Sequence, residues 1–271
     1  MVIPDPESEV QTPKMPNRLI AVCGKGGTGK TVLTTLLAKR VLQQGERKLL
    51  VIDADPAMSL PSTFGLEATK TVSQVREKLI REARSAGKAE KQRIAYSLDY
   101  MLLEALIETE AFSMLVMGRP DSLGCYCPVN ELLRDGIETL AANFGTVLMD
   151  CEAGIEQISR QVIRSVDTPI IVSDVSARGL QTASVIKKVI ESHKIANCRK
   201  LGLVINRVRG NEQDFAELVC RTGLEVSGWI PEDENITRFD MEARPLLHLP
   251  NDSPAFVAAG HILSKLETGT R

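Results

Sequence analysis

The 271-residue sequence contains no continuous apolar run of about 18 residues, so we expect no membrane-spanning helix. Basic residues are not in excess either, because 33 Lys and Arg stand against 35 Asp and Glu, a formal net charge of −2. Sequence-independent nucleic-acid binding depends on excess positive charge, so we expect neither a nucleic-acid nor a membrane partner. The first 17 residues lack an apolar signal core, and residues 1–17 are predicted to form a flexible tail on a cytoplasmic protein.

Disulfides are not expected, because the six cysteines occur without an export signal. Four of them stand singly and are predicted to be small buried residues: Cys23, Cys151, Cys198 and Cys220. Cys125 and Cys127 are separated by one residue in GCYCPVNELL. A Cys-x-Cys unit supplies only half of a tetrahedral metal site. Either the pair packs idly in a turn, or further ligands come from elsewhere.

Short β-branched runs alternate with helical patterns, which indicates an α/β fold: one domain with a mostly parallel central sheet flanked by helices. Strands are predicted at Arg18–Cys23, Lys48–Asp53, Phe112–Met117, Thr146–Asp150, Pro169–Ser173, Lys200–Asn206 and Glu225–Trp229. Apolar spacing predicts helices over Thr31–Gln44 and from about Pro254 to Leu266. The charged segment at about 67–111, with its helical pattern running through Ile107, is predicted to be a helical insertion in a domain spanning 18–271. It could cover the sheet or carry partner specificity.

The stretch GKGGTGKT fits the phosphate-binding pattern G-x-x-x-x-G-K-[ST], between a predicted strand and an amphipathic helix. Glycines let backbone N–H groups turn toward phosphate oxygens, and a helix N-terminus favours negative charge. Lys30 should reach the terminal phosphates, and the Thr31 hydroxyl should bind Mg²⁺. The predicted nucleotide-binding loop comprises Gly24, Lys25, Gly26, Gly27, Thr28, Gly29, Lys30, Thr31 and Val32.

With a lysine directly after its first glycine, this loop resembles the signature of the deviant P-loop (deviant Walker A) ATPases. That group includes the nitrogenase iron protein and the Min and Par partition ATPases. The resemblance implies an ATP- and Mg²⁺-dependent ATPase in which Lys25 and Lys30 are catalytic. Lys25 would reach across a homodimer interface to the partner's nucleotide, as an arginine finger does. Val32 departs from the second threonine that many members carry, which affects one side-chain contact to phosphate.

Three aspartates at the ends of predicted strands match acidic positions of that family. In VIDADP, the resemblance assigns Asp55 to activation of the attacking water, as a catalytic residue, and Asp53 to the metal shell. In VLMDCEAG, Asp150 begins the switch II pattern D-x-x-A-G and should hold Mg²⁺ through water. Together with Thr31, these three aspartates form the predicted magnesium site.

The same resemblance places further residues around the nucleotide. Ala153 and Gly154 of switch II should lie close to the γ-phosphate. VINRVR and GWIPED resemble the adenine-binding loops of the family. Asn206 would therefore read the base edge, with Arg207 and Pro231 flanking the base.

The relatives differ in what their ATPase cycle drives. The C-terminal HILSKLETGTR is short and weakly basic, unlike a Min-type membrane helix, and the slightly acidic chain does not suit Par-type DNA binding. Nitrogenase iron protein and its reductase relatives hold a [4Fe–4S] cluster with one cysteine on each side of switch II. Cys125 lies in the first of these regions, but GIEQISRQ after Asp150 has no cysteine, and Cys151 is too close to the phosphate site.

The sequence most resembles the nickel-insertion (CooC-type) ATPases that mature carbon monoxide dehydrogenase, through the P-loop, the D-x-D-P stretch, CYC and AGIE. In that family the Cys-x-Cys units of two subunits meet on a two-fold axis and bind one metal ion. A C2 dimer duplicates every surface residue, so Cys125 and Cys127 would become four thiolates, which suit Ni²⁺ or Zn²⁺.

The resulting hypothesis is an ATP-dependent homodimeric metallochaperone. It would insert nickel into a client such as carbon monoxide dehydrogenase or acetyl-CoA synthase. Two alternatives remain: a reductase with a [4Fe–4S] cluster bridged by the same cysteines, and a Min- or Par-like positioning ATPase.

Overall fold

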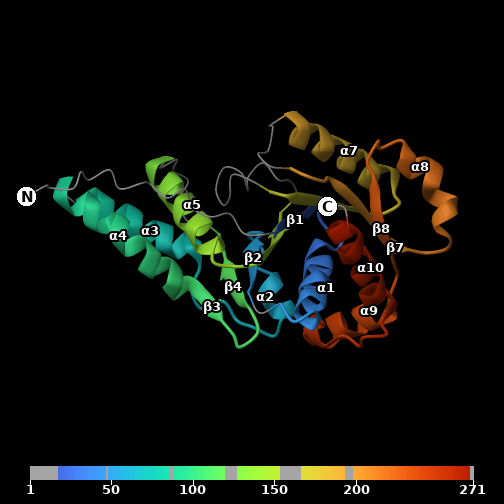
Figure 1. Ribbon diagram of the computed structural model, residues 1–271, viewed down its shortest axis with the longest axis horizontal. Helices are drawn as coiled ribbons and strands as arrows, with labels where there is room; N and C mark the ends of the chain where they lie inside the picture. The colour runs from blue at the N-terminus through green and yellow to red at the C-terminus, as the bar shows by residue number, and fades with distance from the viewer. Residues whose placement is uncertain are drawn as a thin grey trace, which may run out of the picture.

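A single eight-stranded sheet organises the molecule, in the order β3-β4-β2-β5-β1-β6-β7-β8 (Figure 1). The computed structural model describes residues 18–46, 48–85, 88–119, 127–152, 166–192 and 198–268. The strands are β1 (Arg18–Gly24), β2 (Leu49–Ala54), β3 (Leu106–Glu108), β4 (Ser113–Val116), β5 (Thr146–Cys151), β6 (Thr168–Ser173), β7 (Gly202–Val208) and β8 (Val226–Pro231). The short strand β3 pairs antiparallel with β4, and the other recorded pairings are parallel. The predicted fold class is confirmed.

Helices cover both faces of this sheet, as parallel strands require, because each crossover between two parallel strands must pass over a face. They are α1 (Lys30–Gln43), α2 (Leu60–Thr63), α3 (Val72–Ser85), α4 (Lys88–Ala105), α5 (Cys127–Ala141), α7 (Ala177–Ser192), α8 (Ala216–Cys220), α9 (Glu234–Met241) and α10 (Pro254–Thr268), with 3₁₀ turns η1 (Glu212–Phe215) and η2 (Leu246–His248). Helices α3, α4 and α5 form a group beside the β3–β4 edge, at the left of Figure 1.

The two faces of the sheet carry separate hydrophobic cores, because successive strand residues point to opposite sides. Leu19 and Ala21 of β1 belong to the core that includes residues of α3, α4, α5 and α7. Ile20 and Val22, their neighbours in sequence, belong to the core formed with α1, α2, α9 and α10. All four side chains are fully buried. The continuous apolar runs of the central strands therefore follow from burial on both sides.

The predicted helical pattern fails at the end of the 67–111 segment. It continues through Ile107, but Leu106 and Ile107 lie in β3, opposite Leu115 and Met114 of β4. Two consecutive apolar residues after a helical segment are compatible locally with either a further helical turn or a strand. Here the available edge of β4 favours the strand, because pairing with it forms backbone hydrogen bonds and packs both side chains. Helix α4 therefore stops at Ala105.

The prediction that the single cysteines are buried is half wrong. Cys23 and Cys151 are buried, on neighbouring strands β1 and β5, whereas Cys198 and Cys220 are exposed. Both exposed thiols lie outside the central strands, Cys198 in a connection and Cys220 at the last residue of α8. Whether a cysteine is buried thus depends on whether it lies in a central strand or in a peripheral element.

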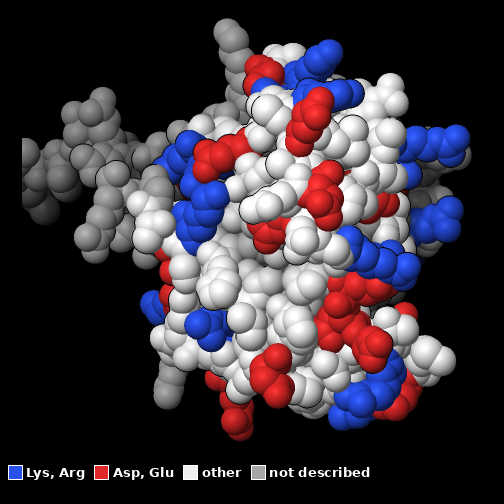
Figure 2. Space-filling view, turned by 90° about the vertical axis from the view of Figure 1, so that its right-hand side faces the viewer, with Lys and Arg blue, Asp and Glu red and all other residues white. Residues whose placement is uncertain are grey.

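The surface on the α8 side of the molecule carries acidic and basic side chains interspersed with one another (Figure 2). This distribution agrees with a formal net charge of −2 spread over many ionised groups of both signs. In the described ranges, every helix is too short or too polar to cross a membrane.

The buried carboxylate of Asp233 joins the starts of two helices after β8. One oxygen accepts hydrogen bonds from Asn235 N at 2.9 Å and Asn235 Nδ2 at 3.0 Å, which caps α9. The other accepts from the Ser253 hydroxyl and from Ala255 N at 3.0 Å, at the start of α10. Burial raises the pKa of Asp233, but these donors outweigh it and hold the pKa below its ordinary value. The loop after Pro231 is fixed by this double cap.

We predict that Asp233→Ala lowers the free energy of unfolding by about 3 kcal/mol, because several buried donors lose a charged acceptor. Urea denaturation measures the change. Asp240→Ala, at an exposed site on the same helix, should stay within about 0.5 kcal/mol of the parent chain. Equal losses in the two variants would contradict the assigned cap.

Candidate functional site: a phosphate loop facing buried carboxylates

The phosphate loop connects β1 to α1 at the carboxyl edge of the sheet and depends on glycine at two close approaches. Gly24 has φ 141°, and a Cβ there would lie 2.2 Å from the Val172 carbonyl oxygen on β6. Gly29 has φ 90°, and a Cβ there would lie 2.2 Å from Asn206 Nδ2. A side chain at position 24 would displace the backbone of β6, and one at position 29 would displace the Asn206 amide group. The loop is therefore seated tightly against the sheet at both ends.

The two lysines of the loop occupy different environments. Lys30, the first residue of α1, is buried, with 7% of its surface exposed, whereas Lys25 is partly exposed. The Lys25 carbonyl accepts hydrogen bonds from Thr28 N at 3.3 Å and Thr28 Oγ1 at 2.8 Å, which fixes the backbone of the turn. Lys30 is thus held inside its own subunit, and Lys25 lies nearer the solvent.

A hydrogen bond joins the start of α1 to the end of β5. Thr31 Oγ1 donates to Asp150 Oδ2 at 2.6 Å. Asp150 is fully buried, and among the described residues its other oxygen, Oδ1, has no hydrogen-bond partner. Such an orphaned carboxylate oxygen is rare in a folded protein and needs a donor or a cation. Hydroxyl and carboxylate oxygens are the ligands Mg²⁺ prefers, so this pair fits the predicted ion.

Asp53 lies next to Asp150, because these residues are register partners on the parallel strands β2 and β5. Its Oδ1 accepts from Asp55 N at 3.0 Å and its Oδ2 from Leu60 N at 3.1 Å, so the carboxylate shapes the loop after β2. Asp55 is partly exposed, and its Oδ1 accepts from Ala57 N at 2.9 Å. Asp55 is thus the more accessible carboxylate of the two.

Burial raises the pKa of both inner carboxyls. Desolvation raises the pKa of Asp150 to about 7, with a contribution from the charge of Asp53, although the hydrogen bond from Thr31 lowers it. Desolvation likewise raises the pKa of Asp53 to about 6, against the two backbone N–H donors. Two buried carboxyls side by side cannot both ionise cheaply without a cation. This edge of the sheet therefore favours either a proton or a metal ion.

The residues predicted to surround the base lie at the ends of β7 and β8. Asn206 is buried, its Nδ2 donates to Thr28 O at 2.8 Å, and its Oδ1 accepts from Arg207 N at 2.9 Å. Arg207 is exposed, with a φ of 56°, and Pro231 ends β8. The Asn206 amide is therefore bound to the phosphate loop itself, a contact that its position in VINRVR does not predict.

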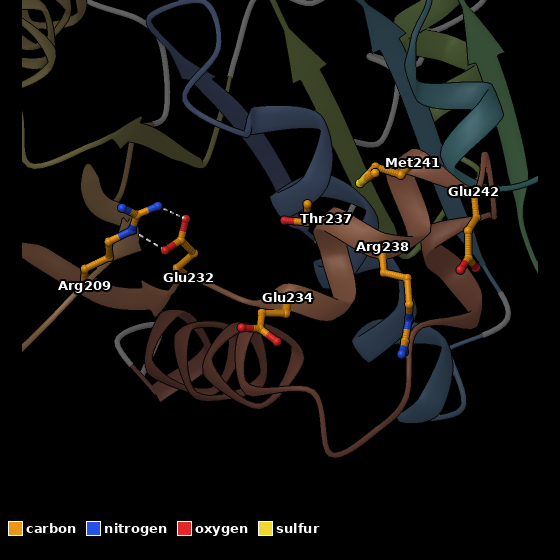
Figure 3. Close-up of a pocket in the computed structure, with 7 residues that line it drawn as sticks. All are labelled: Arg209, Glu232, Glu234, Thr237, Arg238, Met241 and Glu242. Carbon is orange, nitrogen blue, oxygen red and sulfur yellow. Dashed lines mark hydrogen bonds and ion pairs between the residues drawn. The ribbon is translucent and has the colours of Figure 1, made fainter.

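An open groove of about 590 Å³ follows directly after Pro231 (Figure 3). Arg209 forms an ion pair with Glu232 on one side, with Nη2 at 2.6 Å from Oε1, and the outer surface of α9 forms the other. The hydrogen bond from Arg209 and the charges of Arg209 and Arg207 lower the pKa of Glu232. The lining residues are Arg209, Glu232, Glu234, Thr237, Arg238, Met241 and Glu242.

Sequence reasoning missed this groove and one hydroxyl at the metal edge. The groove residues on α9 carry no motif, although their spacing places them on one helix face. Ser59 Oγ lies 3.4 Å from Thr31 Oγ1. No sequence pattern marks this serine, which lies four residues after Asp55. Only the turn that follows β2 in the folded chain brings it close to the phosphate loop.

Part of the predicted site falls outside the described residues. Cys125, Ala153 and Gly154 lie there, and Cys127 is described only as the backbone start of α5. Among the described residues, no group of three or more His, Cys, Asp and Glu side chains is arranged to hold a metal ion. Val32 lies partly exposed in the first turn of α1, beside Thr31.

Comparisons with known proteins agree with this geometry. A family model described as the CobQ/CobB/MinD/ParA nucleotide binding domain matches residues 19–246. An uncharacterized ATP-binding protein of Methanocaldococcus jannaschii is 38% identical over 256 residues, covering 92% of this chain and 98% of that protein. The carbon monoxide dehydrogenase accessory protein CooC of Rhodospirillum rubrum is 30% identical over 208 residues, covering 69% and 78% respectively.

Among solved structures, the septum site-determining protein MinD of Pyrococcus horikoshii, complexed with Mg-ADP, matches with a TM-score of 0.66. The match covers 92% of this chain and 96% of that one, at 22% identity. At this identity, the likeness concerns the fold.

Raised carboxyl pKa values predict that magnesium–nucleotide binding releases protons. Between pH 6 and 7 the Asp53 and Asp150 carboxyls together hold roughly one proton, mostly on Asp150, and a bound cation must displace it. Titration calorimetry in buffers of different ionisation enthalpy should record release of roughly one proton per nucleotide, falling toward zero above pH 8. The Asp150→Asn variant should lose this release, and proton-neutral binding by the parent chain would contradict the assignment.

Proposed function

Because this chain belongs to the CobQ/CobB/MinD/ParA nucleotide-binding family and is a P-loop ATPase, we propose that it is an ATP-dependent homodimeric metallochaperone. Its cargo would be Ni²⁺ or Zn²⁺, held by Cys125 and Cys127 of two subunits. Its client would be a nickel enzyme, such as carbon monoxide dehydrogenase or acetyl-CoA synthase. The relative that bears the name of a carbon monoxide dehydrogenase accessory protein supports this client class. We also propose a cytoplasmic location, where such thiols stay reduced.

One observation supports the proposal: the helix that begins at a predicted metal ligand follows a strand joined to the edge of the sheet that holds the phosphate loop. Helix α5 begins at Cys127, and the chain leaves β4 for that helix beside Asp53, because Met117 N donates to Asp53 O at 2.8 Å. Pro128 in the first turn suits a helix start. A thiol beside a helix N-terminus is favoured as the thiolate that binds metal.

In the proposed hydrolysis, Asp55 orients a water molecule toward the γ-phosphorus. The new bond forms from this water oxygen, the bond to the β–γ bridging oxygen breaks, and ADP leaves as the water proton passes to the released phosphate. Lys30 holds the terminal phosphates, while Thr31 and Asp150 would hold Mg²⁺, with Asp53 behind them. Mg²⁺, when bound, neutralises charge on the β- and γ-phosphate oxygens.

The dimer supplies the coupling between ATP and metal. Lys25, partly exposed in the loop, would contact the partner's phosphates, so ATP closes the two subunits. Closure brings two Cys-x-Cys units to the two-fold axis and completes four ligands. Hydrolysis removes the γ-phosphate, the dimer opens, and a site divided between separated subunits releases its ion.

The nucleotide base belongs, in this proposal, beside Asn206, with Arg207 and Pro231 on either side. The groove that begins at Glu232 lies next to these residues and would take the exposed part of the base and ribose. Asn206 Oδ1 has a second lone pair for the base edge, since Arg207 N uses one.

A reductase with a bridging [4Fe–4S] cluster is the alternative that shares the same cysteines. Cys151, the last residue of β5, is buried, and burial raises its pKa well above the ordinary value, so it does not suit a surface cluster. Anaerobically purified protein would be brown, with about four iron atoms per dimer, if the reductase assignment were correct. A positioning ATPase would instead show ATPase activity stimulated by lipid or DNA.

Replacing both interface cysteines, Cys125→Ser and Cys127→Ser together, should abolish stoichiometric Ni²⁺ or Zn²⁺ binding and leave basal ATPase activity within about twofold, since the thiols lie outside the phosphate loop. Equilibrium dialysis with metal analysis gives the stoichiometry. The exposed pair Cys198→Ser and Cys220→Ser is the matched control and should bind metal normally. Binding of one ion per dimer by the first variant would refute the site.

Removing the first lysine of the loop, by Lys25→Ala, should leave ATP binding by the monomer nearly intact and eliminate ATP-induced dimerisation. Loss of a cross-subunit charge on the phosphates should also lower kcat by about 10³-fold. Light scattering with and without ATP measures the assembly, and Lys48→Ala, at an exposed position before β2, serves as control. A variant that still dimerises with ATP would exclude the proposed role.

A further inference from the structure

Met117 forms a junction between the nucleotide edge of the sheet and helix α3. Its N–H donates to the carbonyl of Asp53, at the end of β2, at 2.8 Å. Its own carbonyl accepts two hydrogen bonds from Ser73, one from the backbone N and one from Oγ, each at 2.8 Å. One residue thus binds the strand that carries Asp53 on one side and the first turn of α3 on the other.

The fit between α3 and the segment after β4 is close. Gly118 follows Met117 with a φ of 74°, and a Cβ there would lie 2.6 Å from Thr71 Cβ and Oγ1. Thr71 is itself fixed, because its N–H donates to Gln74 Oε1 at 3.0 Å and its Oγ1 lies 3.4 Å from Gln74 N, the reciprocal pattern of a capping box. The first turn of α3 is therefore held as a rigid unit against this segment.

The second turn of α3 binds the start of α5. Arg76 Nε donates to Asn130 Oδ1 at 2.8 Å in a partly buried contact, three residues beyond the first residue of α5. Farther along, Gly136 of α5 packs so closely on α4 that a Cβ there would lie 2.7 Å from Leu102 Cδ1. Ser73 and Arg76 are three residues apart, so they lie on one face of the helix.

We propose that the first two turns of α3 form a positioning element that transmits nucleotide-dependent movement of the Asp53 edge to α5, with Ser73 and Arg76 as its positioning residues. The inference rests on the proposed function, because α5 begins at a predicted metal ligand. Asp53 organises the loop after β2 through Asp55 N and Leu60 N, so a change of that loop on ATP binding displaces the end of β2. Met117 and Ser73 pass the displacement to α3, and Arg76 passes it to Asn130.

The alternative is that these contacts only stabilise the fold, and the Arg76–Asn130 contact separates the two roles. Asn130→Leu removes the acceptor at similar volume, Arg76→Met removes the donor and keeps an unbranched stem, and Asn130→Asp keeps an acceptor. Lys78→Met removes an exposed positive charge from the same helix and is the matched control. None of these residues belongs to the proposed phosphate, magnesium or cysteine sites.

Hydrogen exchange of the first two turns of α5, with and without ATP, is the readout that needs no metal. The parent chain should show an ATP-induced change in exchange of about fivefold or more. The ratio of exchange rates with and without ATP should fall toward one in Arg76→Met and Asn130→Leu. It should persist in Asn130→Asp and Lys78→Met. Basal kcat should stay within about twofold throughout, because the nucleotide site is intact.

The ratio of Ni²⁺ dissociation constants measured with and without ATP is the second readout, and it should collapse in the same two variants. An ATP effect on α5 exchange that survives both variants, or disappears equally in Lys78→Met, overturns the inference. The same holds if ATP leaves α5 exchange of the parent chain unchanged. If the parent chain binds no metal but the exchange pattern is as expected, the proposed function fails and the positioning role stands.

Discussion

The hydrogen bond from the Thr31 hydroxyl to Asp150 ties the start of α1 to the end of β5, and the arrangement of the whole site depends on that joint. It places a hydroxyl, a buried lysine and a buried carboxylate within one edge of the sheet, and one oxygen of that carboxylate has no partner among the described residues. Parallel pairing of β2 with β5 then adds Asp53 at the same level. Desolvated carboxyls resist ionisation, so the apo edge retains a proton that a cation with its nucleotide replaces.

This arrangement makes the nucleotide edge a two-state element in chemical terms. Without a cation, desolvation favours a proton on Asp150, and a bound cation favours the ionised form of both carboxylates. The Asp53 oxygens also accept hydrogen bonds from the backbone at Asp55 and Leu60, so this carboxylate joins the metal edge to the loop after β2. Under the proposed function this loop would communicate with the cargo site, and Met117 makes the described physical contact toward α3.

How much the sequence predicts depends on whether a feature is local. The phosphate loop is predictable because its glycines, lysine and threonine have fixed spacing, and burial on both faces makes the strands of the sheet readable as apolar runs. Strand β3 was not predicted, because its two apolar residues continue a helical pattern and only the edge of β4 decides their structure. The exposure of Cys198 and Cys220 likewise depends on tertiary context.

Contacts between distant residues were beyond prediction for the same reason. Ser253 donates a hydrogen bond to Asp233, twenty positions earlier, and Ser73 donates one to the carbonyl of Met117. Asn206 donates one to the carbonyl of Thr28. No pattern of residue types in the sequence predicts any of these three contacts. The family resemblance predicts Asn206 beside a base, and the structure adds its hydrogen bond to the phosphate loop. Such contacts connect a recognisable motif to distant parts of the chain.

In the proposed mechanism, two incomplete thiolate sites become one when ATP closes the dimer. Native mass spectrometry of anaerobically prepared protein loaded with Ni²⁺ or Zn²⁺, with and without ATP, tests this coupling. We expect a dimer with ATP that carries one metal ion in total, and monomers without ATP that carry none. One ion on each monomer regardless of ATP, or a dimer that carries four iron atoms, would contradict it.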